Sequence, residues 1–180
     1  SADCWANQDL FFLDEAGAPT VVAGVPPDYF SADGQLWGNP LYRWERHETT
    51  GFAWWNQRLK AWAERFDALR LDHFIGLRRY WEIPAGEKTA IKGRWVNAPG
   101  DEMFETVLRE VSELEIVAED LGVATPGVIA LRDKFKFPGM RLAQFSFGGE
   151  EKDWPVKWPM NCVGYTGTHD NDSTRGWWED

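Results

Sequence analysis

Three acidic residues stand directly after short, mainly apolar runs, and they are this chain's candidates for chemistry. The runs are 68–71, 114–118 and 162–169, and the acids that follow them are Asp72, Glu119 and Asp170. A short apolar run that stops at a charge is typical of a buried parallel strand that delivers a side chain at its carboxyl end. Parallel barrels build active sites from such ends, and paired carboxylates are the usual apparatus for cleaving glycosidic bonds. The alternative is that each acid caps a following helix, which explains any one of them better than all three.

Arg70 stands two residues before Asp72, so both side chains point to the same face of the expected strand. A neighbouring guanidinium holds a carboxylate in place and keeps it ionised, as the nucleophile of a glycosidase requires. A purely structural Arg–Asp pair is an equally good interpretation of this spacing. The spacing therefore leaves both interpretations open.

Glu119 differs from Asp72 because it follows a more apolar run, and burial raises a carboxyl pKa toward the range that suits a general acid. Asp120 is expected to point to the other face or into the following turn, where it can cap the turn. Taken alone, the sequence Glu-Asp-Leu-Gly is more typical of an ordinary strand-to-turn transition than of a catalytic site.

The segment 168–173 is dense in polar side chains, and a metal site is one interpretation of it, since His and Asp are good ligands. The other two histidines, His47 and His73, show no ligand spacing relative to it. We therefore expect no metal.

Composition excludes several classes of partner. The chain has 180 residues, a net charge of −10 and a calculated pI of about 4.8, which argues against binding to nucleic acid or an anionic membrane. No run of about 18 apolar residues is present, and no signal peptide is visible, so we expect a cytoplasmic protein.

Twelve tryptophans are far more than an ordinary chain of this length carries. A tryptophan offers a large flat apolar face, which suits the apolar face of a sugar ring, although core packing is the alternative. Trp55 and Trp62 fit the core interpretation because they lie on the apolar stripe of an expected helix. Trp37 does not, because it lies in a segment bounded by Gly and Pro that is predicted to be a loop.

The periodicity predicts helices alternating with strands, which implies a parallel sheet with crossover connections. Residues 1–48 are expected to be mostly irregular, with a short hairpin between 11–13 and 21–22, and 76–100 is expected to be a long polar stretch. The expected helices cover 50–66, 101–114 and a segment that begins at Thr125-Pro126, and the expected strands cover 68–72, 115–119, 140–147 and 162–168.

Four segments together resemble the 4-α-glucanotransferases, the amylomaltases or disproportionating enzymes of the α-amylase superfamily. They are Gly34-Gln35-Leu36-Trp37-Gly38-Asn39-Pro40, Arg70-Leu71-Asp72-His73-Phe74, Ala118-Glu119-Asp120-Leu121-Gly122 and Thr168-His169-Asp170-Asn171-Asp172. The match covers essentially the whole chain in the right order, and jointly the four motifs are highly specific.

The resemblance implies an α/β fold: a partial (β/α)8 TIM barrel of roughly strands four to seven, with a long insertion loop rich in aromatics, Pro and Gly. Residues 1–48 would form the irregular insertion and acceptor-side loop, and residues 49–180 the βα units. The N-terminal and C-terminal parts of the barrel would be absent, which makes the chain a fragment. An open barrel exposes sheet edges, which argues against stability and activity of the isolated segment.

The resemblance also implies roles for individual residues. Asp72 would be the nucleophile, Glu119 the general acid and then the base, and Asp170 the residue that holds the sugar hydroxyls and stabilises the transition state. Six further residues are expected to bind substrate or to orient the site: Arg70, His169, Gln35, Trp37, Asp120 and His73.

The implied reaction is the transfer of segments of α-1,4-glucans to an acceptor sugar by a retaining double displacement, with no cofactor. The expected partners are malto-oligosaccharides and glucans of the starch or glycogen type. Two alternatives stay open at this point: an α-glucan hydrolase with the same three acids, and a non-catalytic carbohydrate-binding relic of such an enzyme.

Overall fold

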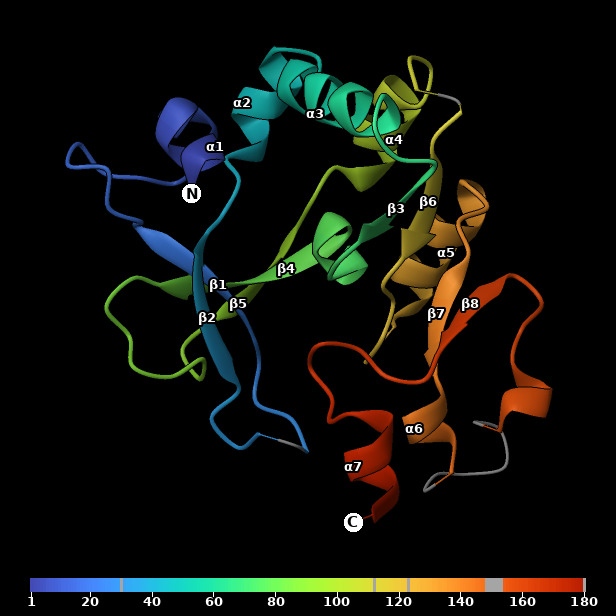
Figure 1. Ribbon diagram of the computed structural model, residues 1–180. Helices are drawn as coiled ribbons and strands as arrows, with labels where there is room; N and C mark the ends of the chain where they lie inside the picture. Colours follow the sequence, from blue (N-terminus) through green and yellow to red (C-terminus); the bar gives the residue numbers. More distant parts are fainter. Residues whose placement is uncertain (30, 112, 123, 148–153, 180) are drawn as a thin grey trace. The chain divides into compact units, whose positions relative to one another are not determined.

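The computed structural model describes residues 1–29, 31–111, 113–122, 124–147 and 154–179, which form a mixed α/β fold (Figure 1). The chain divides into two compact units, and each is described by itself. The first unit comprises residues 1–65 and 75–113, and the second comprises residues 66–74 and 114–180. The first unit thus contains all of the segment 1–48.

A four-stranded antiparallel sheet forms the centre of the first unit. Its strands are β1 (Val21–Val25), β2 (Gln35–Pro40), β4 (Arg79–Pro84) and β5 (Arg94–Asn97), in the order β2-β1-β4-β5. The segments 1–48 and 76–100 therefore contain four strands, where the sequence predicted none beyond a short hairpin. Local propensity does not reveal the centre of this sheet, because β1 pairs with β4 far away in sequence, as Val21 does with Pro84.

Gly24 on β1 shows how a residue that usually signals a loop serves inside this sheet. A Cβ at this position would lie 2.2 Å from the carbonyl oxygen of Gln35 and 2.7 Å from Cδ1 of Ile83. Glycine is thus required by the close approach of the neighbouring strands rather than by a turn. The short hairpin expected between 11–13 and 21–22 is confirmed in part: Leu13 pairs with Pro19, and the amide of Thr20 donates to the carbonyl of Phe12 at 2.9 Å, while Val22 belongs to β1.

Helices of the first unit run along the top of the view in Figure 1, with the sheet below them. The helix expected over 50–66 is confirmed as α3, whereas the helix expected to reach residue 114 ends at Val107 in a turn. The helical segments are α1 (Ala2–Ala6), η1 (Gln8–Leu10), α2 (Trp44–Thr49), α3 (Ala53–Ala63) and α4 (Gly100–Val107), and η2 (Phe74–Leu77) begins at the unit boundary.

An aromatic cluster under α2 and α3 accounts for part of the tryptophan content. Trp44 and Trp55 stack with ring centroids 5.9 Å apart, and Tyr42, His47 and Trp54 pack around them at 5.2–6.4 Å. Trp55 is buried as expected, which confirms core packing for this residue, while Trp62 is partly exposed.

Parallel strand pairs form the second unit, in agreement with the alternation expected from the sequence. β3 (Ala68–Leu71) pairs with β6 (Glu115–Ala118), and β7 (Gly139–Leu142) pairs with β8 (Cys162–Tyr165). The amide of Ala118 donates to the carbonyl of Pro138 at 2.9 Å, which brings β6 beside the start of β7. The carboxyl ends of these strands therefore face the same way.

Among the described residues of this unit, three helices and a 3-10 turn accompany the strands. α5 begins at Pro126 with Thr125 before it, as predicted. The prediction of one strand over 140–147 is wrong, because β7 ends at Leu142 and α6 follows at once; a short apolar run does not by itself distinguish strand from helix. The elements are α5 (Pro126–Lys134), α6 (Ala143–Ser146), η4 (Pro155–Lys157) and α7 (Thr174–Glu179).

Two aliphatic residues on α5 allow its packing to be tested. Leu131 is 1% exposed, whereas Ile129 on the same helix is 39% exposed. We expect Leu131→Ala to lower the free energy of unfolding by about 2–5 kcal/mol because it leaves a cavity. Ile129→Ala is the matched control and should change it by less than about 1 kcal/mol. Chemical denaturation followed by circular dichroism measures both, and equal losses would contradict the packing described for α5.

Candidate active site

Asp72 and Glu119 are held at adjoining strand ends by the parallel register of β3 and β6. Leu71 is paired with Ala118, so each acid is the first residue beyond its strand. Two backbone hydrogen bonds continue the pairing: the amide of Glu119 donates to the carbonyl of Leu71 at 2.9 Å, and the amide of Phe74 donates to the carbonyl of Glu119 at 3.0 Å. The structure thus brings the two acids together.

The carboxylate of Glu119 is partly buried and accepts two backbone hydrogen bonds. The amide of His73 donates to Oε2 at 2.6 Å, and the amide of Leu121 donates to Oε1 at 3.0 Å. Burial raises the pKa of the Glu119 carboxyl, and the charge of Asp72 raises it further, while the two amides and Arg70 act in the opposite direction. The net result is a pKa above the ordinary value for Glu, as a general acid requires.

Asp72 has a different environment, although it lies beside Glu119. Its side chain is 68% exposed, and Nη2 of Arg70 donates to its Oδ1 at 2.5 Å. An ion pair exposed to this degree contributes at most about 1 kcal/mol to stability. Stability is therefore a weak reason for this arrangement, and the open interpretation of Arg70 as the residue that orients a reactive carboxylate is favoured.

Asp120 faces away from solvent and is 3% exposed. Its Oδ1 accepts from the amide of Met140 at 2.9 Å, and its Oδ2 accepts from Nη1 of Arg132 at 2.5 Å. Nη1 of Arg141 lies 3.4 Å from Oδ1. Because protein donors enclose both oxygens, the geometry favours a role in joining β6 to α5 and β7 over the expected contact with substrate.

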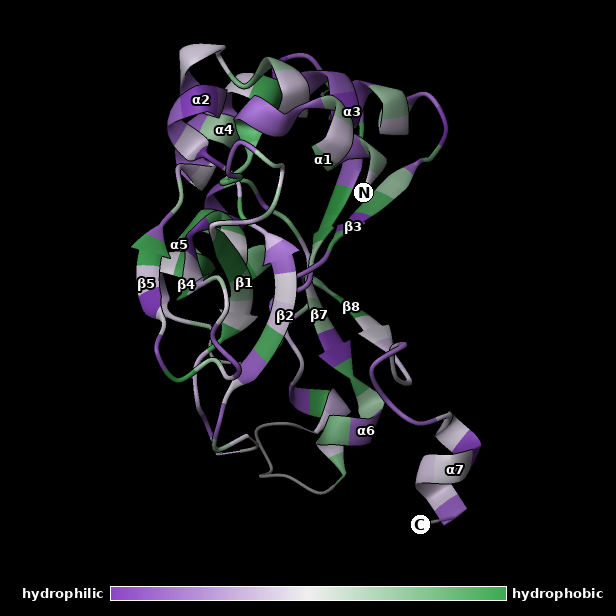
Figure 2. Ribbon diagram, turned by 90° about the vertical axis from the view of Figure 1, so that its left-hand side faces the viewer, coloured by the Kyte–Doolittle hydropathy of each residue, from purple (hydrophilic) through white to green (hydrophobic). Residues whose placement is uncertain are grey.

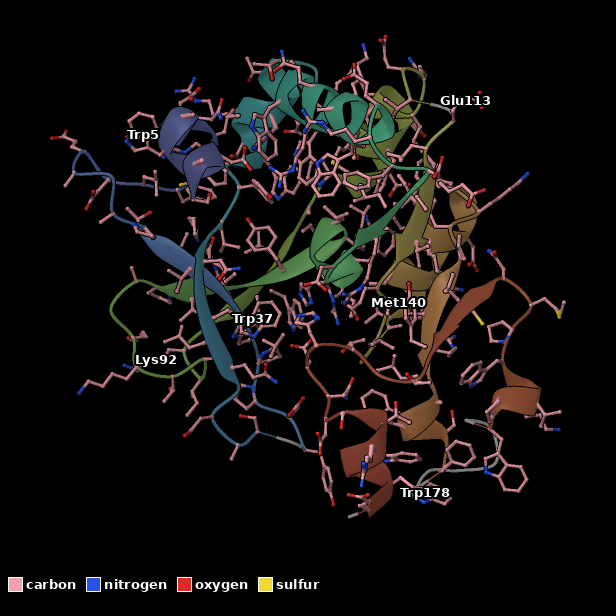
Figure 3. The ribbon with its side chains drawn as sticks, viewed as in Figure 1. Trp5, Trp37, Lys92, Glu113, Met140 and Trp178 are labelled. Atoms are coloured by element: carbon pink, nitrogen blue, oxygen red, sulfur yellow. The ribbon has the colours of Figure 1, made fainter. Side chains whose placement is uncertain are left out.

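Gly139 leaves the space that the Asp120 carboxylate occupies. A Cβ at position 139 would lie 2.7 Å from Oδ2 and 2.9 Å from Oδ1. The amide of Met140, on β7 (Figure 3), therefore donates to the Asp120 side chain. In an ordinary parallel strand pair, a backbone carbonyl would accept this hydrogen bond.

His73 adopts a left-handed backbone conformation, with φ of +46°. Its ring is partly buried, and burial lowers the pKa of the imidazole while the charge of Asp72 opposes this effect. The expectation from the sequence placed the imidazole against substrate, whereas the contact seen near Glu119 is made by the backbone amide.

His169 and Asp170 lie on the exposed loop that follows β8, with Nε2 of His169 and Oδ1 of Asp170 3.4 Å apart. Asn171 orders this loop by accepting from both the amide and the hydroxyl of Thr168 at 2.9 Å. The strand expected over 162–168 therefore ends early, at Tyr165.

Gln144 supports the same loop and was missed by the sequence reasoning. Its side chain is buried on α6, and its Nε2 donates to the carbonyl of Asp172 at 2.9 Å. A Cβ at Gly167 would lie 2.8 Å from this nitrogen, so the loop packs closely on Gln144. The error in placing 140–147 on one strand concealed this contact, because a helix gives its side chains other directions.

Gln35 and Trp37 belong to the first unit, where both are exposed. Nε1 of Trp37 donates to Oε1 of Gln35 at 3.0 Å. The loop predicted for Trp37 is wrong: the residue lies on β2 (Figure 3), a strand that Figure 2 colours mainly white and purple with one green band. A strand fixes the backbone of these two side chains more firmly than a loop would.

The structure also bears on metals and membranes, within residues 1–29, 31–111, 113–122, 124–147 and 154–179. In these ranges, His, Cys, Asp and Glu side chains form no group of three or more arranged to hold a metal ion. None of the helices in the same ranges is long and apolar enough to span a membrane.

Comparison with known proteins connects this geometry to a family. The family model described as 4-alpha-glucanotransferase matches residues 1–180. The chain belongs to the 4-alpha-glucanotransferase family. Curated relatives include the 4-alpha-glucanotransferases of Thermus thermophilus, 54% identical over 99% of this chain, and of Synechocystis, 53% identical over 100%. The chloroplastic/amyloplastic 4-alpha-glucanotransferase of Solanum tuberosum is 48% identical over 99% of this chain.

The chain spans about a third of the length of these family members, at 36%, 37% and 31% of the three relatives. Among solved structures, amylomaltase from Streptococcus agalactiae in complex with acarbose is 42% identical, with a TM-score of 0.92 over 100% of this chain and 37% of its own. Amylomaltase from Corynebacterium glutamicum is 21% identical with a TM-score of 0.82, covering 99% of this chain and 25% of its own, and supports the fold alone.

Arg132 pairs with two carboxylates, which gives a matched test of the Asp120 contacts. Asp120 is buried, whereas Asp133 is 56% exposed and lies 2.7 Å from Nη2 of Arg132. We expect Asp120→Ala to lower the free energy of unfolding by about 3–5 kcal/mol, because it leaves a guanidinium without its buried partner. Asp133→Ala should cost less than about 1 kcal/mol. Denaturant titration compares the two, and a small loss for Asp120→Ala would argue against the joining role.

Proposed function

We propose that this chain supplies the reacting carboxylates of a 4-α-glucanotransferase. The observation that carries the proposal is the pair of Asp72 and Glu119 at adjoining parallel strand ends, one exposed beside an arginine and the other partly buried. Burial raises the pKa of the Glu119 carboxyl, which suits the acid, and the exposed carboxylate beside it is left for the role of nucleophile. Membership of the family supports the same assignment.

The proposed reaction is a double displacement. The Asp72 carboxylate attacks the anomeric carbon while Glu119 protonates the glycosidic oxygen that leaves, which gives a covalent glucosyl-enzyme. Glu119, now ionised, takes the proton from an acceptor hydroxyl, whose oxygen displaces Asp72. Two inversions retain the anomeric configuration and imply a carboxyl separation of about 5–5.5 Å. These steps need no cofactor.

Asp170 and His169 are proposed to hold the hydroxyls of the reacting sugar, and Arg70 to orient Asp72. Their positions support these roles, because β8 runs parallel to β7 and the loop after it carries the first two residues. We also propose that β3, β6, β7 and β8 are consecutive strands of a (β/α)8 barrel, roughly strands four to seven. Active sites in that fold form at the carboxyl ends of the strands.

Transfer rather than hydrolysis requires a sugar hydroxyl to react with the intermediate before water does. Trp37 and Gln35 are proposed to bind the acceptor, since an exposed indole stacks on a sugar ring and Gln35 fixes its edge through the 3.0 Å hydrogen bond. The proposed substrates are malto-oligosaccharides and glucans of the starch or glycogen type. The cytoplasmic location stays a prediction, since the Solanum tuberosum relative is described as chloroplastic/amyloplastic.

Products formed from maltotriose by the full protein that contains this chain test the reaction. A ladder of longer malto-oligosaccharides with free glucose is the expected result, whereas glucose and maltose alone would indicate the hydrolase and overturn the role of Trp37. Asp72→Asn should lower turnover by at least about 1,000-fold, because the nucleophile is lost. Asp133→Asn is the control for a changed surface charge. Normal turnover by Asp72→Asn would exclude Asp72 as the nucleophile.

Glu119 should set the alkaline limb of the pH profile. The general acid must be protonated, so kcat/KM falls as pH rises through its pKa. Because burial raises that pKa, the fall should lie above pH 4.5, the ordinary value for this group. Glu119→Gln should lose this limb together with most of the activity on maltotriose. A limb at or below pH 4.5 would remove Glu119 from the role of acid.

A further inference from the structure

The geometry points to His73 as a positioning residue that acts through its backbone, because its left-handed conformation lets its own amide and the next amide both donate to Glu119. This inference rests on the proposed function, in which Glu119 is the acid and base. In this role the backbone of His73 acts and its imidazole does not. The inference therefore predicts that the backbone conformation at position 73 matters more than the side chain.

Two consecutive amides converge on Glu119 at the turn that follows β3. The amide of His73 donates to Oε2 at 2.6 Å, and the amide of Phe74 donates to the backbone carbonyl at 3.0 Å. In an extended strand, successive amides point in opposite directions. Both reach one residue here because φ of His73 is +46°, which turns the chain sharply after Asp72.

The left-handed conformation is rare for residues with a Cβ, although Asn, Asp and His adopt it more often than others, and glycine adopts it without strain. Such strain persists where the surrounding structure enforces it, and it gathers at functional sites. At His73 it is offset by a short hydrogen bond to a carboxylate, a type stronger than a bond between neutral groups. Lys136 and Phe52 are also non-glycine residues with positive φ, but neither is next to a candidate catalytic acid.

Charged groups around Glu119 are few among the described residues of its unit. From β3 it faces Asp72 and Arg70, whose charges act in opposite directions. At its own strand end, Asp120 is engaged by Arg132 from α5 and by Arg141 from β7. The His73 ring is kept neutral by burial near neutral pH, so removing it deletes no charge there.

Loss of the His73 amide contact has a defined electrostatic consequence. A hydrogen bond to the ionised form favours ionisation, so this amide holds the pKa of Glu119 lower than burial alone would set it. A variant that turns the amide away should raise that pKa. Its alkaline limb in kcat/KM then moves to higher pH, while substrate binding, reported by KM, changes little.

Four substitutions at one position test the inference on the full protein with maltotriose. Glycine and asparagine suit the left-handed conformation, alanine suits it less, and a β-branched residue suits it least. We expect His73→Gly and His73→Asn to lower kcat by less than about tenfold and to keep the alkaline limb in place. His73→Val should lower kcat by about 100-fold or more, within the range for impaired acid–base catalysis, and should move the limb upward by about one pH unit.

The kcat of His73→Ala should lie between those of these variants. The order of the glycine, asparagine and alanine variants then tests the inference even if His73→Val does not fold. Equal losses in all four variants, with a raised KM, would assign the role to the imidazole and overturn the inference. A ranking unrelated to left-handed preference, or an alkaline limb that does not move as kcat falls, would overturn it as well. Failure of the proposed function can be told apart from failure of this inference. In that case the unsubstituted protein itself would not convert maltotriose into longer oligosaccharides.

Discussion

Two hydrogen bonds that continue the β3–β6 pairing hold the proposed nucleophile beside the proposed acid, and the chemistry depends on them. Parallel register brings Leu71 opposite Ala118, so the next residue on each strand is a carboxylic acid at the same edge. Two identical functional groups then differ only by their surroundings. Asp72 is exposed beside Arg70, whereas partial burial raises the pKa of the Glu119 carboxyl.

The residues next to these acids make contacts that hold the backbone. The amide of His73 donates to Glu119, and the carboxylate of Asp120 accepts from Arg132 and from the amide of Met140. Glu119 thus lies between two anchored neighbours and has limited freedom to rotate. Preorganisation of this kind is what positions a catalytic group before the substrate arrives.

The sequence allowed the parallel strands and their terminal acids to be predicted because both are local signals. A buried parallel strand is a short apolar run, and the acid after it stands out against that run. The Arg70–Asp72 contact followed from the spacing of two residues on one strand. The antiparallel sheet was missed because Gly24 and the Pro-rich segment are typical of loops, and because β1 pairs with β4 far away in sequence, as Val21 and Pro84 show.

Residues whose direction depends on an element boundary were the least predictable. Gln144 was placed on a strand that in fact ends at Leu142, so its contact with the Asp172 carbonyl was not visible in the pattern. For Asp120, alternation of side chains predicted the face opposite to Glu119, whereas the family resemblance implied a contact with substrate. Its contact with Arg132 from α5 agrees with the first prediction.

The contact between β6 and β7 has a consequence for which substitutions this protein tolerates. A backbone ladder is indifferent to the residues that form it, since every residue except proline offers the same donor and acceptor. Here one rung is a side chain, the carboxylate of Asp120 on the amide of Met140, and it fits only because position 139 is glycine. This junction between β6 and β7 therefore depends on the identity of two residues, and a substitution at position 120 or at position 139 would disturb the contact.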